Sequence, residues 1–583
     1  MMKKVIYAFL SCFALLLTGG CQEQNCVEEI DTSHARNSLY LNLSLRVNDG
    51  SGAASRATDE DVIPGTGDEN TIHSLYIYLF NSETGALVYW ADITNLYQAD
   101  NTKTYAIKLQ DINLPEKVSI YLAANLTRQQ AESITSPTAS YKTNATSYTR
   151  AINEFAPYEF MPQFGVTGIS KRDIGIAMTG QAVSGSDKVF DIHGHTSPDK
   201  PLALTVDLKR VVAKALLTVV PSDDDGNYAV IASGNEHKGW VRISDIYYFP
   251  NGTNKSLYWF EQENNKDPNS DLTDYISSTG TDTELALNTE NYQNDFVYYN
   301  QTEQYKLYYA YYQAQKFDQR IDDSNTYTAG MYFLENTFTI PKETSEYKAQ
   351  LENYKLALPM VTSISIALRY TPKEIYVEKG LYEKLEKGEG MSASEREKWN
   401  TMKGKYQGNK PWDEATWTEG VSVSAVIFND EADAQFVLTM SLKLNEAYIS
   451  STEYGNQVTN GTYSGTKFPD NTFFAFTPET NTDESFLYHY YTYGARQNIE
   501  NPIYYVPYVG GWAYYYTYLD GDGTNTTNKA VYSDSQVTRN TYYILKLNKI
   551  TRLGGSKSDP NNIQVNTTVV PWKKGGRLDV DLW

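Results

Sequence analysis

The chain has 583 residues and a formal net charge of −21, from 50 basic and 71 acidic residues. This length predicts two or more domains, and the acidic excess argues against nucleic acid or an anionic membrane surface as partners. All three cysteines lie at or before Cys26, which excludes a disulfide framework or a thiolate metal site in the rest of the chain. Packed cores must therefore supply the stability.

The first 21 residues have the pattern of a bacterial lipoprotein signal. Lys3 and Lys4 precede an apolar run from Val5 to Leu17, and the segment ends in small residues before Cys21. That run is too short for a helix that spans a bilayer, which needs about 20 apolar residues. We therefore expect a lipid, of the palmitate type, on Cys21. The alternative is a plain secretory signal with a chance cysteine.

The next element is a predicted strand with one buried face. Apolar residues recur at every second position, and the set consists of Leu39, Leu41, Leu43, Leu45 and Val47. A Gly/Ala/Ser-rich segment follows and reaches Arg56 and Ala57, the composition of a loop that a protease can enter. Two interpretations follow. The segment is either an ordinary first strand followed by an ordinary loop, or a strand that proteolysis in the loop removes.

The whole chain contains 49 tyrosines, a residue that strands favour, and the part after this loop is predicted to be mainly β. Alternating runs typical of sandwich strands occupy residues 74–80, 117–123, 202–208 and 363–369. We place a linker at Gly194–Pro201, with one domain over 57–199 and a second over 200–583. One helical stretch is expected from about Pro372 to Met402, with the capping-box spacing of Ser394 and Glu397. It predicts a helical insertion on the second domain.

No catalytic constellation emerges from the motifs, and we expect no cofactor. His193 and His195 have ligand-like spacing but no third ligand nearby, so a loop pair is favoured over a metal site. The acidic runs at 223–227 and 520–525 are interpreted as hairpin tips in preference to calcium loops. The tyrosine-rich runs could stack on sugars or on a protein, although strand packing explains them as well.

The C-terminus holds two further alternating segments. The alternate positions of the first are Ile563, Val565, Thr567 and Val569, and those of the second are Leu578, Val580 and Leu582. Each set shares one face of a strand.

Several short motifs together resemble the Bacteroidales type V pilus subunits, the fimbrillins, and within them the minor-fimbrium (Mfa) branch. At the C-terminus these are Arg539-Asn540-x-x-Tyr543, continuing into aliphatic residues, and the Val-x-Pro-Trp of residues 569–572. Cys21, the Ser-Arg-Ala of residues 55–57, the segment 209–214 and the Leu-Glu-Asn of residues 334–336 agree. The likeness spans the chain but leaves residues 251–295 and the charged helix without a counterpart.

This resemblance implies a structural pilin without enzymatic activity, built from two transthyretin-like (Greek-key) β-sandwiches. Residues 1–21 are then the signal, and 22–56 a propeptide whose strand an Arg-specific protease removes after Arg56. Another subunit's C-terminal strand fills the vacated groove, a case of β-strand addition. The precursor is an outer-membrane lipoprotein and the product a cell-surface fimbrium that supports adhesion, with related pilins as partners and a host glycan or protein as a candidate receptor.

Two other functions remain open from the sequence. A tip adhesin, or a surface glycan-binding lipoprotein, would keep residues 22–56. A hydrolase would use carboxylates hidden among the abundant acidic residues.

Overall fold

The computed structural model describes 24 stretches of the chain, and every statement below refers to them. They are residues 38–47, 71–95, 104–108, 115, 117–135, 145–147, 175–195, 197–231, 239–278, 285–287, 290–291, 295–297, 312–316, 330–337, 361–406, 414–416, 422–444, 470–476, 490–491, 505–519, 536–550, 553–555, 565–566 and 579–582.

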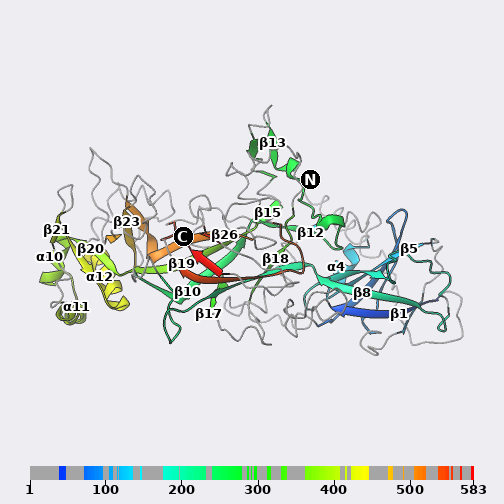
Figure 1. The fold of residues 1–583 in the computed structure, drawn as a ribbon, viewed down its shortest axis with the longest axis horizontal. Helices are drawn as coiled ribbons and strands as arrows, with labels where there is room; N and C mark the ends of the chain where they lie inside the picture. The colour runs from blue at the N-terminus through cyan, green and yellow to red at the C-terminus, as the bar shows by residue number, and fades with distance from the viewer. Residues whose placement is uncertain are drawn as a thin grey trace, which may run out of the picture. The chain divides into compact units, whose positions relative to one another are not determined.

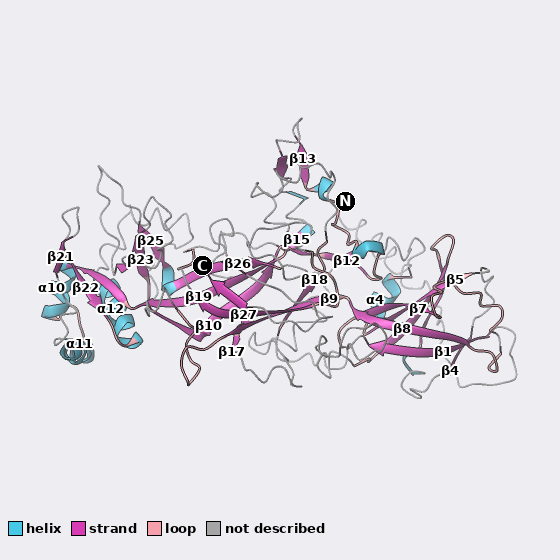
Figure 2. Ribbon diagram, in the orientation of Figure 1, coloured by secondary structure: helices cyan, strands magenta, loops and turns pink. Residues whose placement is uncertain are grey.

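The chain divides into two compact units. The first contains β1 to β5, the short helix α4 and most of β7 and β8, whereas the second contains β6 and everything from Lys209 onward. Strands dominate both units (Figure 2), which confirms the prediction of a mainly β protein. Within the described residues, no helix is long and apolar enough to cross a bilayer.

A seven-stranded sheet forms the first unit. Its order is β3 (Leu87–Asp92), β2 (Leu75–Asn81), β5 (Val118–Ala124), β7 (Met178–Val183), β8 (Leu202–Arg210), β1 (Ser38–Val47) and β4 (Thr104–Lys108). Nearly every side chain of β2 and β5 is buried, so both faces of the sheet are covered there. Helix α4 (Arg128–Ser133) is tied to β2, because the Tyr78 hydroxyl donates to the Ala131 carbonyl.

The expected linker at Gly194–Pro201 is instead a pair of turns between β7 and β8. The backbone N–H of His195 donates to the Ile192 carbonyl, and that of Lys200 to the Ser197 carbonyl. Since β8 then runs through the first unit's sheet, the chain divides after Leu208.

Three larger sheets build the second unit (Figure 1). One has the order β17 (Gln315–Lys316), β9 (Val212–Val219), β27 (Tyr542–Ile550), β29 (Asp579–Leu582), β28 (Val565–Asn566), with β18 (Met331–Leu334) also on β9. A four-stranded sheet has the order β16 (Tyr312–Gln313), β10 (Gly239–Asn251), β19 (Ser363–Pro372), β26 (Trp512–Tyr518). The Tyr248 hydroxyl of β10 donates to the Ala215 carbonyl of β9, so these two sheets meet over one apolar core.

The third sheet carries the helices. Its order is β21 (Glu414–Thr416), β22 (Ser422–Ile427), β20 (Glu374–Glu378), β24 (Tyr490–Tyr491), β23 (Phe473–Phe476), β25 (Tyr505–Tyr508). The small strand pairs are β11 (Thr253–Asn254) with β15 (Phe296–Val297), β12 (Ser256–Tyr258) with β6 (Ala145–Ser147), and β13 (Ile276–Ser278) with β14 (Leu285–Leu287). Short 3-10 turns are η5 (Glu263–Asn265), η6 (Leu272–Asp274) and η10 (Val509–Gly511).

The predicted helix needs three corrections. Pro372, where it was expected to begin, is the last residue of β19, the residues from Glu374 to Glu378 form β20, and the helical part is split into α10 (Lys379–Lys387) and α11 (Ala393–Tyr406). The capping box begins at Ser392, because the Ser392 hydroxyl accepts from the N–H of Glu395 and the Glu395 carboxylate accepts from the N–H of Ser392. A further helix, α12 (Glu431–Leu444), was not predicted.

Candidate functional site

The strand β1 lies inside the first unit's sheet, between β8 and β4 (Figure 2). Its pairing with β4 is antiparallel and runs from Ser38 opposite Lys108 to Asn42 opposite Thr104. On its other side, at the start of the strand, the N–H of Tyr40 donates to the His195 carbonyl at 3.0 Å. An inner strand shares its backbone hydrogen bonds with neighbours on both sides, so its loss opens a gap in the sheet.

The alternation predicted for β1 is present, and the burial of its apolar side chains decreases toward Val47. Leu39, Leu41 and Leu43 are 1%, 0% and 4% exposed, whereas Leu45 and Val47 are half-buried. The neighbouring β8 alternates in the same way, with Leu202, Leu204, Val206 and Leu208 buried. Two apolar faces of adjacent strands therefore line one strip of the first unit's core.

The predicted processing residues, Cys21, Arg56 and Ala57, lie outside the described residues. Of the C-terminal set, Ile563, Thr567, Val569 and Leu578 also lie outside them. Val565 falls in β28, and Val580 and Leu582 fall in β29. There β29 runs parallel to β27, with Val580 opposite Leu547, and β28 pairs antiparallel with β29. These terminal strands thus extend a sheet of the second unit, whereas β1 belongs to the first.

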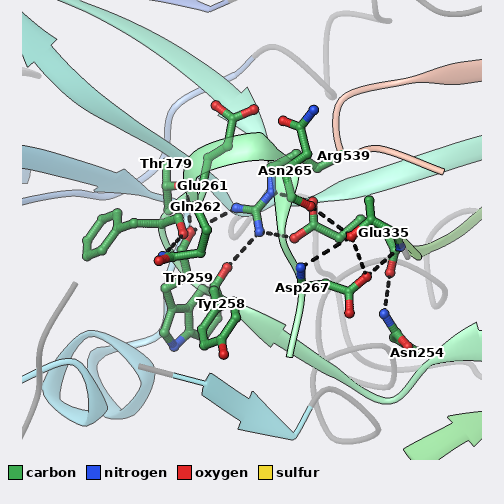
Figure 3. Close-up of polar contacts among 12 residues, drawn as sticks. Thr179, Asn254, Tyr258, Trp259, Glu261, Gln262, Asn265, Asp267, Glu335 and Arg539 are labelled. Atoms are coloured by element: carbon green, nitrogen blue, oxygen red, sulfur yellow. Dashed lines mark hydrogen bonds and ion pairs between the residues drawn. The ribbon is translucent and has the colours of Figure 1, made fainter. Parts of the chain in front are cut away.

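Two of the motifs noted in the sequence meet at a buried ion pair (Figure 3). The guanidinium of Arg539 contacts both carboxylate oxygens of Glu335, with Nε to Oε2 at 2.9 Å. Its Nη1 and Nη2 donate to the carbonyls of Trp259 and Tyr258 at 3.1 and 2.7 Å. Both charged side chains are almost fully buried. Although burial lowers the pKa of Arg539, the neighbouring Glu335 raises it beyond its usual value, so the guanidinium stays charged.

A second buried carboxyl lies close to this pair. Asp267 accepts from the N–H of Thr337 at 2.5 Å, from the Thr337 hydroxyl at 3.0 Å and from the N–H of Asn269 at 2.7 Å. Burial raises the pKa of Asp267 to about 7, and the charge of Glu335 adds to that rise while the hydrogen bonds oppose it.

The segment 209–214 joins the same region. Arg210 donates from Nη1 to the Asn540 Oδ1 at 3.0 Å, and the N–H of Asn540 donates to the Val212 carbonyl at 2.8 Å. Asn540 has φ +57, a left-handed conformation that asparagine tolerates. Lys214 is fully buried, with its Nζ 5.3 and 4.9 Å from the ring centres of Tyr332 and Tyr542. Motifs scattered along the chain therefore build one structural anchor at the start of β9 and β27.

The remaining candidates take local roles. His193 Nδ1 lies 3.2 Å from Asp191, and His195 Nδ1 lies 2.9 Å from the Lys200 carbonyl. Asp223 accepts from the N–H groups of Asn227 and Tyr228, as expected for a turn. In the tyrosine-rich run that forms β26, every side chain after Trp512 is buried, which supports strand packing as its role. Among the described residues, no group of three His, Cys, Asp or Glu side chains is arranged to hold a metal.

Two family models match this chain. Residues 41–170 match "Major fimbrial subunit protein (FimA)", and residues 507–581 match "Major fimbrial subunit protein type IV, Fimbrillin, C-terminal". Both matches are to fimbrillin-type fimbrial subunits, and together they fall on both ends of the chain. The first match covers β1 from Leu41 onward, and the second covers the Arg539 motif and most of the terminal strands. The matches therefore fall on the elements described above. The family resemblance drawn from short motifs is thereby confirmed.

As a fimbrillin, the chain is a structural subunit of a cell-surface fimbrium and assembles with related pilins. Solved structures similar to it include a fimbrilin from Porphyromonas gingivalis, at 10% identity, 94% of this chain, 99% of that chain and a TM-score of 0.35. Others are a putative cell adhesion protein from Parabacteroides distasonis (10%, 94% and 99%, 0.34) and the C-terminally truncated tip fimbrial protein Mfa3 from P. gingivalis (14%, 59% and 83%, 0.24). No curated protein matches the chain in sequence.

The sequence did not reveal how the fimbrillin motifs combine. Glu335 and Arg539 are 204 positions apart, and Asp267 and Thr337 are 70 apart. No local pattern links such residues. The one available signal is that a charged residue sits within an otherwise apolar run, as Lys214 does.

Proposed function

We propose that this fimbrillin polymerises by donor-strand exchange after a protease removes β1. The observation that carries the proposal is the position of β1 between β8 and β4, with three of its own leucines buried. Removing an inner strand leaves unpaired backbone groups along β8 and β4 and uncovers the apolar residues of β8. Such a slot binds an incoming strand through both features.

The strength of this contact follows from burial. Each buried leucine contributes about 1.5–3 kcal/mol to the free energy of burial, so the three at Leu39, Leu41 and Leu43 contribute roughly 5–9 kcal/mol. Without β1 the slot loses that stabilisation and gains exposed apolar surface. A replacement strand restores the stabilisation and covers the exposed apolar surface again, which favours polymer over the trimmed monomer.

Cleavage after Arg56 is the proposed trigger. Arg46 is the arginine within β1, where the backbone already belongs to the sheet and is therefore less accessible to a protease than a loop. In this scheme residues 22–56 are a propeptide, Cys21 holds the precursor at the outer membrane through its lipid, and cleavage releases the subunit. The chain needs no enzymatic activity of its own, since an Arg-specific protease performs the reaction.

The proposed donor is the terminal segment that contains Val565, Val569, Leu578, Val580 and Leu582. Within an isolated chain, β29 is paired with β27. Exchange therefore requires the terminal strands to leave their own sheet and enter the slot of another copy. Possession of both a slot and a donor favours a stalk position over a tip.

The trigger is tested by treating purified precursor with an Arg-specific protease and comparing wild type with Arg56→Ala and the matched control Arg46→Ala. We expect wild type and Arg46→Ala to yield fibres whose N-terminus is Ala57, and Arg56→Ala to stay uncut and monomeric. N-terminal sequencing and electron microscopy give the readout. Assembled fibres whose subunits begin at Cys21 would refute the trigger, and would favour a tip adhesin or a surface glycan-binding lipoprotein that keeps residues 22–56.

The donor is tested separately with Val565→Asp combined with Val569→Asp. Each buried, unpaired carboxylate costs several kcal/mol in the slot, so cut subunits should no longer polymerise while the uncut precursor keeps its circular dichroism spectrum. Val565→Thr with Val569→Thr, which keeps the β-branched shape, is the matched control. Normal fibres from the Asp variant would mean that another segment is the donor.

A further inference from the structure

The four-stranded sheet of the second unit, in which β10, β19 and β26 lie side by side (Figure 1), has a bulge in β10. The pairing of β10 with β19 shifts register between Val241 and Ile246, so residues 242–245 stand opposite Arg369 alone. A bulge redirects side chains out of the regular alternation and is frequent beside functional sites. The last residue of this bulge is Asp245.

Asp245 is a half-buried carboxylate that accepts no hydrogen bond within the described part of the chain. Burial raises its pKa, while the charges of Arg369 and Arg242 oppose that rise. Arg242 contacts Glu431 at 2.8 Å, and Arg369 donates from Nε to the Gly510 carbonyl at 2.9 Å. Both guanidinium groups are held by these partners, and the oxygens of Asp245 keep their capacity to accept hydrogen bonds.

Two aromatic rings lie close to this carboxylate. Tyr247 of β10 and Trp512 of β26 are both partly exposed, and their ring centres are 5.9 Å apart with the planes tilted by 58°. They meet across β19, where Ala367 stands opposite Tyr247 and Arg369 stands opposite Trp512. Burial raises the pKa of Tyr247, and the charge of Asp245 adds to the rise, so the carboxylate lies near the ring pair.

We infer that this surface binds a neutral hexopyranose unit of a glycan. Its members, called the ring site below, are Asp245, Tyr247, Arg369 and Trp512. The C–H groups on one face of a pyranose carry a slight positive charge and pack against the negative face of an aromatic ring. The sugar hydroxyls donate to the Asp245 carboxylate, and such charge-assisted hydrogen bonds are strong. A few polar groups that converge beside an apolar surface are typical of small-ligand sites.

The charge at the ring site favours a neutral sugar. Arg369 balances the charge of Asp245 locally, and Arg242 is balanced by Glu431. An acidic sugar would bring a second negative charge next to Asp245, on a chain whose formal net charge is −21. A neutral pyranose has no such cost, since it offers both hydroxyl donors and an apolar face.

The small exposed area favours a sugar over a protein partner. Tyr514 and Tyr516 follow Trp512 on the same face of β26 but are only 8% and 6% exposed. A protein interface of ordinary size buries about 800 Å² on each partner, whereas two partly exposed rings match the size of one sugar ring. The ring site belongs to the second unit and the β1 slot to the first, so this inference does not rest on donor-strand exchange.

The test uses the full, uncut chain and nuclear magnetic resonance titration with three probes: methyl β-D-galactopyranoside, methyl α-D-glucopyranoside and methyl α-D-mannopyranoside. The variants are Trp512→Ala, Trp512→Phe and Asp245→Asn. Trp90→Ala is the matched control, because Trp90 is also partly exposed and its ring stacks on Tyr78 at 6.3 Å, in the first unit.

We expect at least one glycoside to bind the wild-type chain. Trp512→Ala and Asp245→Asn should each weaken that affinity about tenfold or more, since one removes the stacking ring and the other the charged acceptor. Trp512→Phe, which keeps a ring, should weaken it less, and Trp90→Ala should leave it unchanged. Circular dichroism establishes that each variant folds, and if Trp512→Ala does not, the other two variants at the ring site decide.

Three results would overturn the inference. These are no binding of any of the three glycosides, equal affinity in wild type and Asp245→Asn, or binding of N-acetyl-arginine amide in place of the sugars, which would assign the carboxylate to a basic ligand. Because the uncut chain keeps β1, none of these results depends on donor-strand exchange. The variants at the ring site should also polymerise like wild type once cut.

Discussion

Arg539 is the residue on which the second unit's anchor depends. It reaches Glu335 on one side and two backbone carbonyls on the other, and it begins the turn that leads into β27. A buried pair of this kind adds little when compared with apolar side chains of the same volume, but removal of one partner leaves a charge uncompensated.

The first prediction follows from that asymmetry. Glu335→Gln should lower the free energy of unfolding of the second unit by about 3–5 kcal/mol, measured by urea unfolding followed through tyrosine and tryptophan fluorescence. Glu132→Gln, which removes the exposed partner of Arg128, is the control and should leave the midpoint unchanged. A wild-type midpoint for Glu335→Gln would show that the buried guanidinium is satisfied by the carbonyls alone.

The second prediction concerns Asp267 and pH. Because burial raises its pKa to about 7 in the folded chain from an ordinary value of 3.8, the folded state binds the proton more tightly than the unfolded state. The resulting stabilisation is complete below about pH 4 and disappears as the pH rises through 7. Asp267→Asn should flatten this part of the stability profile, measured as urea midpoints from pH 4 to 8. The same slope in both proteins would assign it to another group.

At the level of elements, the sequence predicted strands well where one face is buried. The alternation over residues 39–47 corresponds to β1, and that over 202–208 to β8. The sequence could not predict that β2, β5 and β9 are buried on both faces, because this depends on which other elements pack against the second face. Helix α12 was missed for a related reason: Glu431 and Asp433 are buried through ion pairs with Arg242 and Lys405, which hides the amphipathic pattern.

The capping box shows a local limit of sequence reasoning. Two Ser-x-x-Glu spacings overlap before α11, at Ser392 and at Ser394, and composition alone does not choose between them. The structure uses Ser392, since α11 begins at Ala393.

This yields the third prediction. Ser392→Ala should reduce the free energy of unfolding by about 1 kcal/mol, a typical effect for loss of an N-cap, whereas Ser394→Ala should have little effect. Thermal denaturation followed at 222 nm, together with hydrogen exchange of α11, provides the comparison. Equal losses for both variants would mean that the hydroxyl pair, 3.2 Å apart, matters more than the cap.

For the whole molecule, the distribution of cysteine sets the chemistry of the fibre. Every cysteine precedes Arg56, so the proposed processing would leave subunits without thiols. Strand insertion then has to supply the durability, through slow unfolding of the inserted strand.

The fourth prediction is that dithiothreitol does not depolymerise assembled fibres, whereas heating in detergent does so only slowly. Sedimentation and electron microscopy before and after treatment provide the measurement. The control is uncut precursor, whose retained Cys26 keeps it sensitive to any thiol-dependent association. Fibres that dissolve in reductant alone would require a covalent link that the trimmed chain does not contain.

The order of strands along the chain also bears on how the subunit is made. The neighbours of β1, namely β4 and β8, both come from the part of the chain before Val212. In contrast, β9 pairs with β27, and the bond from the Thr218 hydroxyl to the Leu545 carbonyl spans 327 positions. Contacts between distant segments form late, and an N-terminal unit folds first as a chain is delivered. In the proposed donor-strand exchange, each subunit would thus fill its own slot with β1 before its terminal strands have emerged to enter a neighbour.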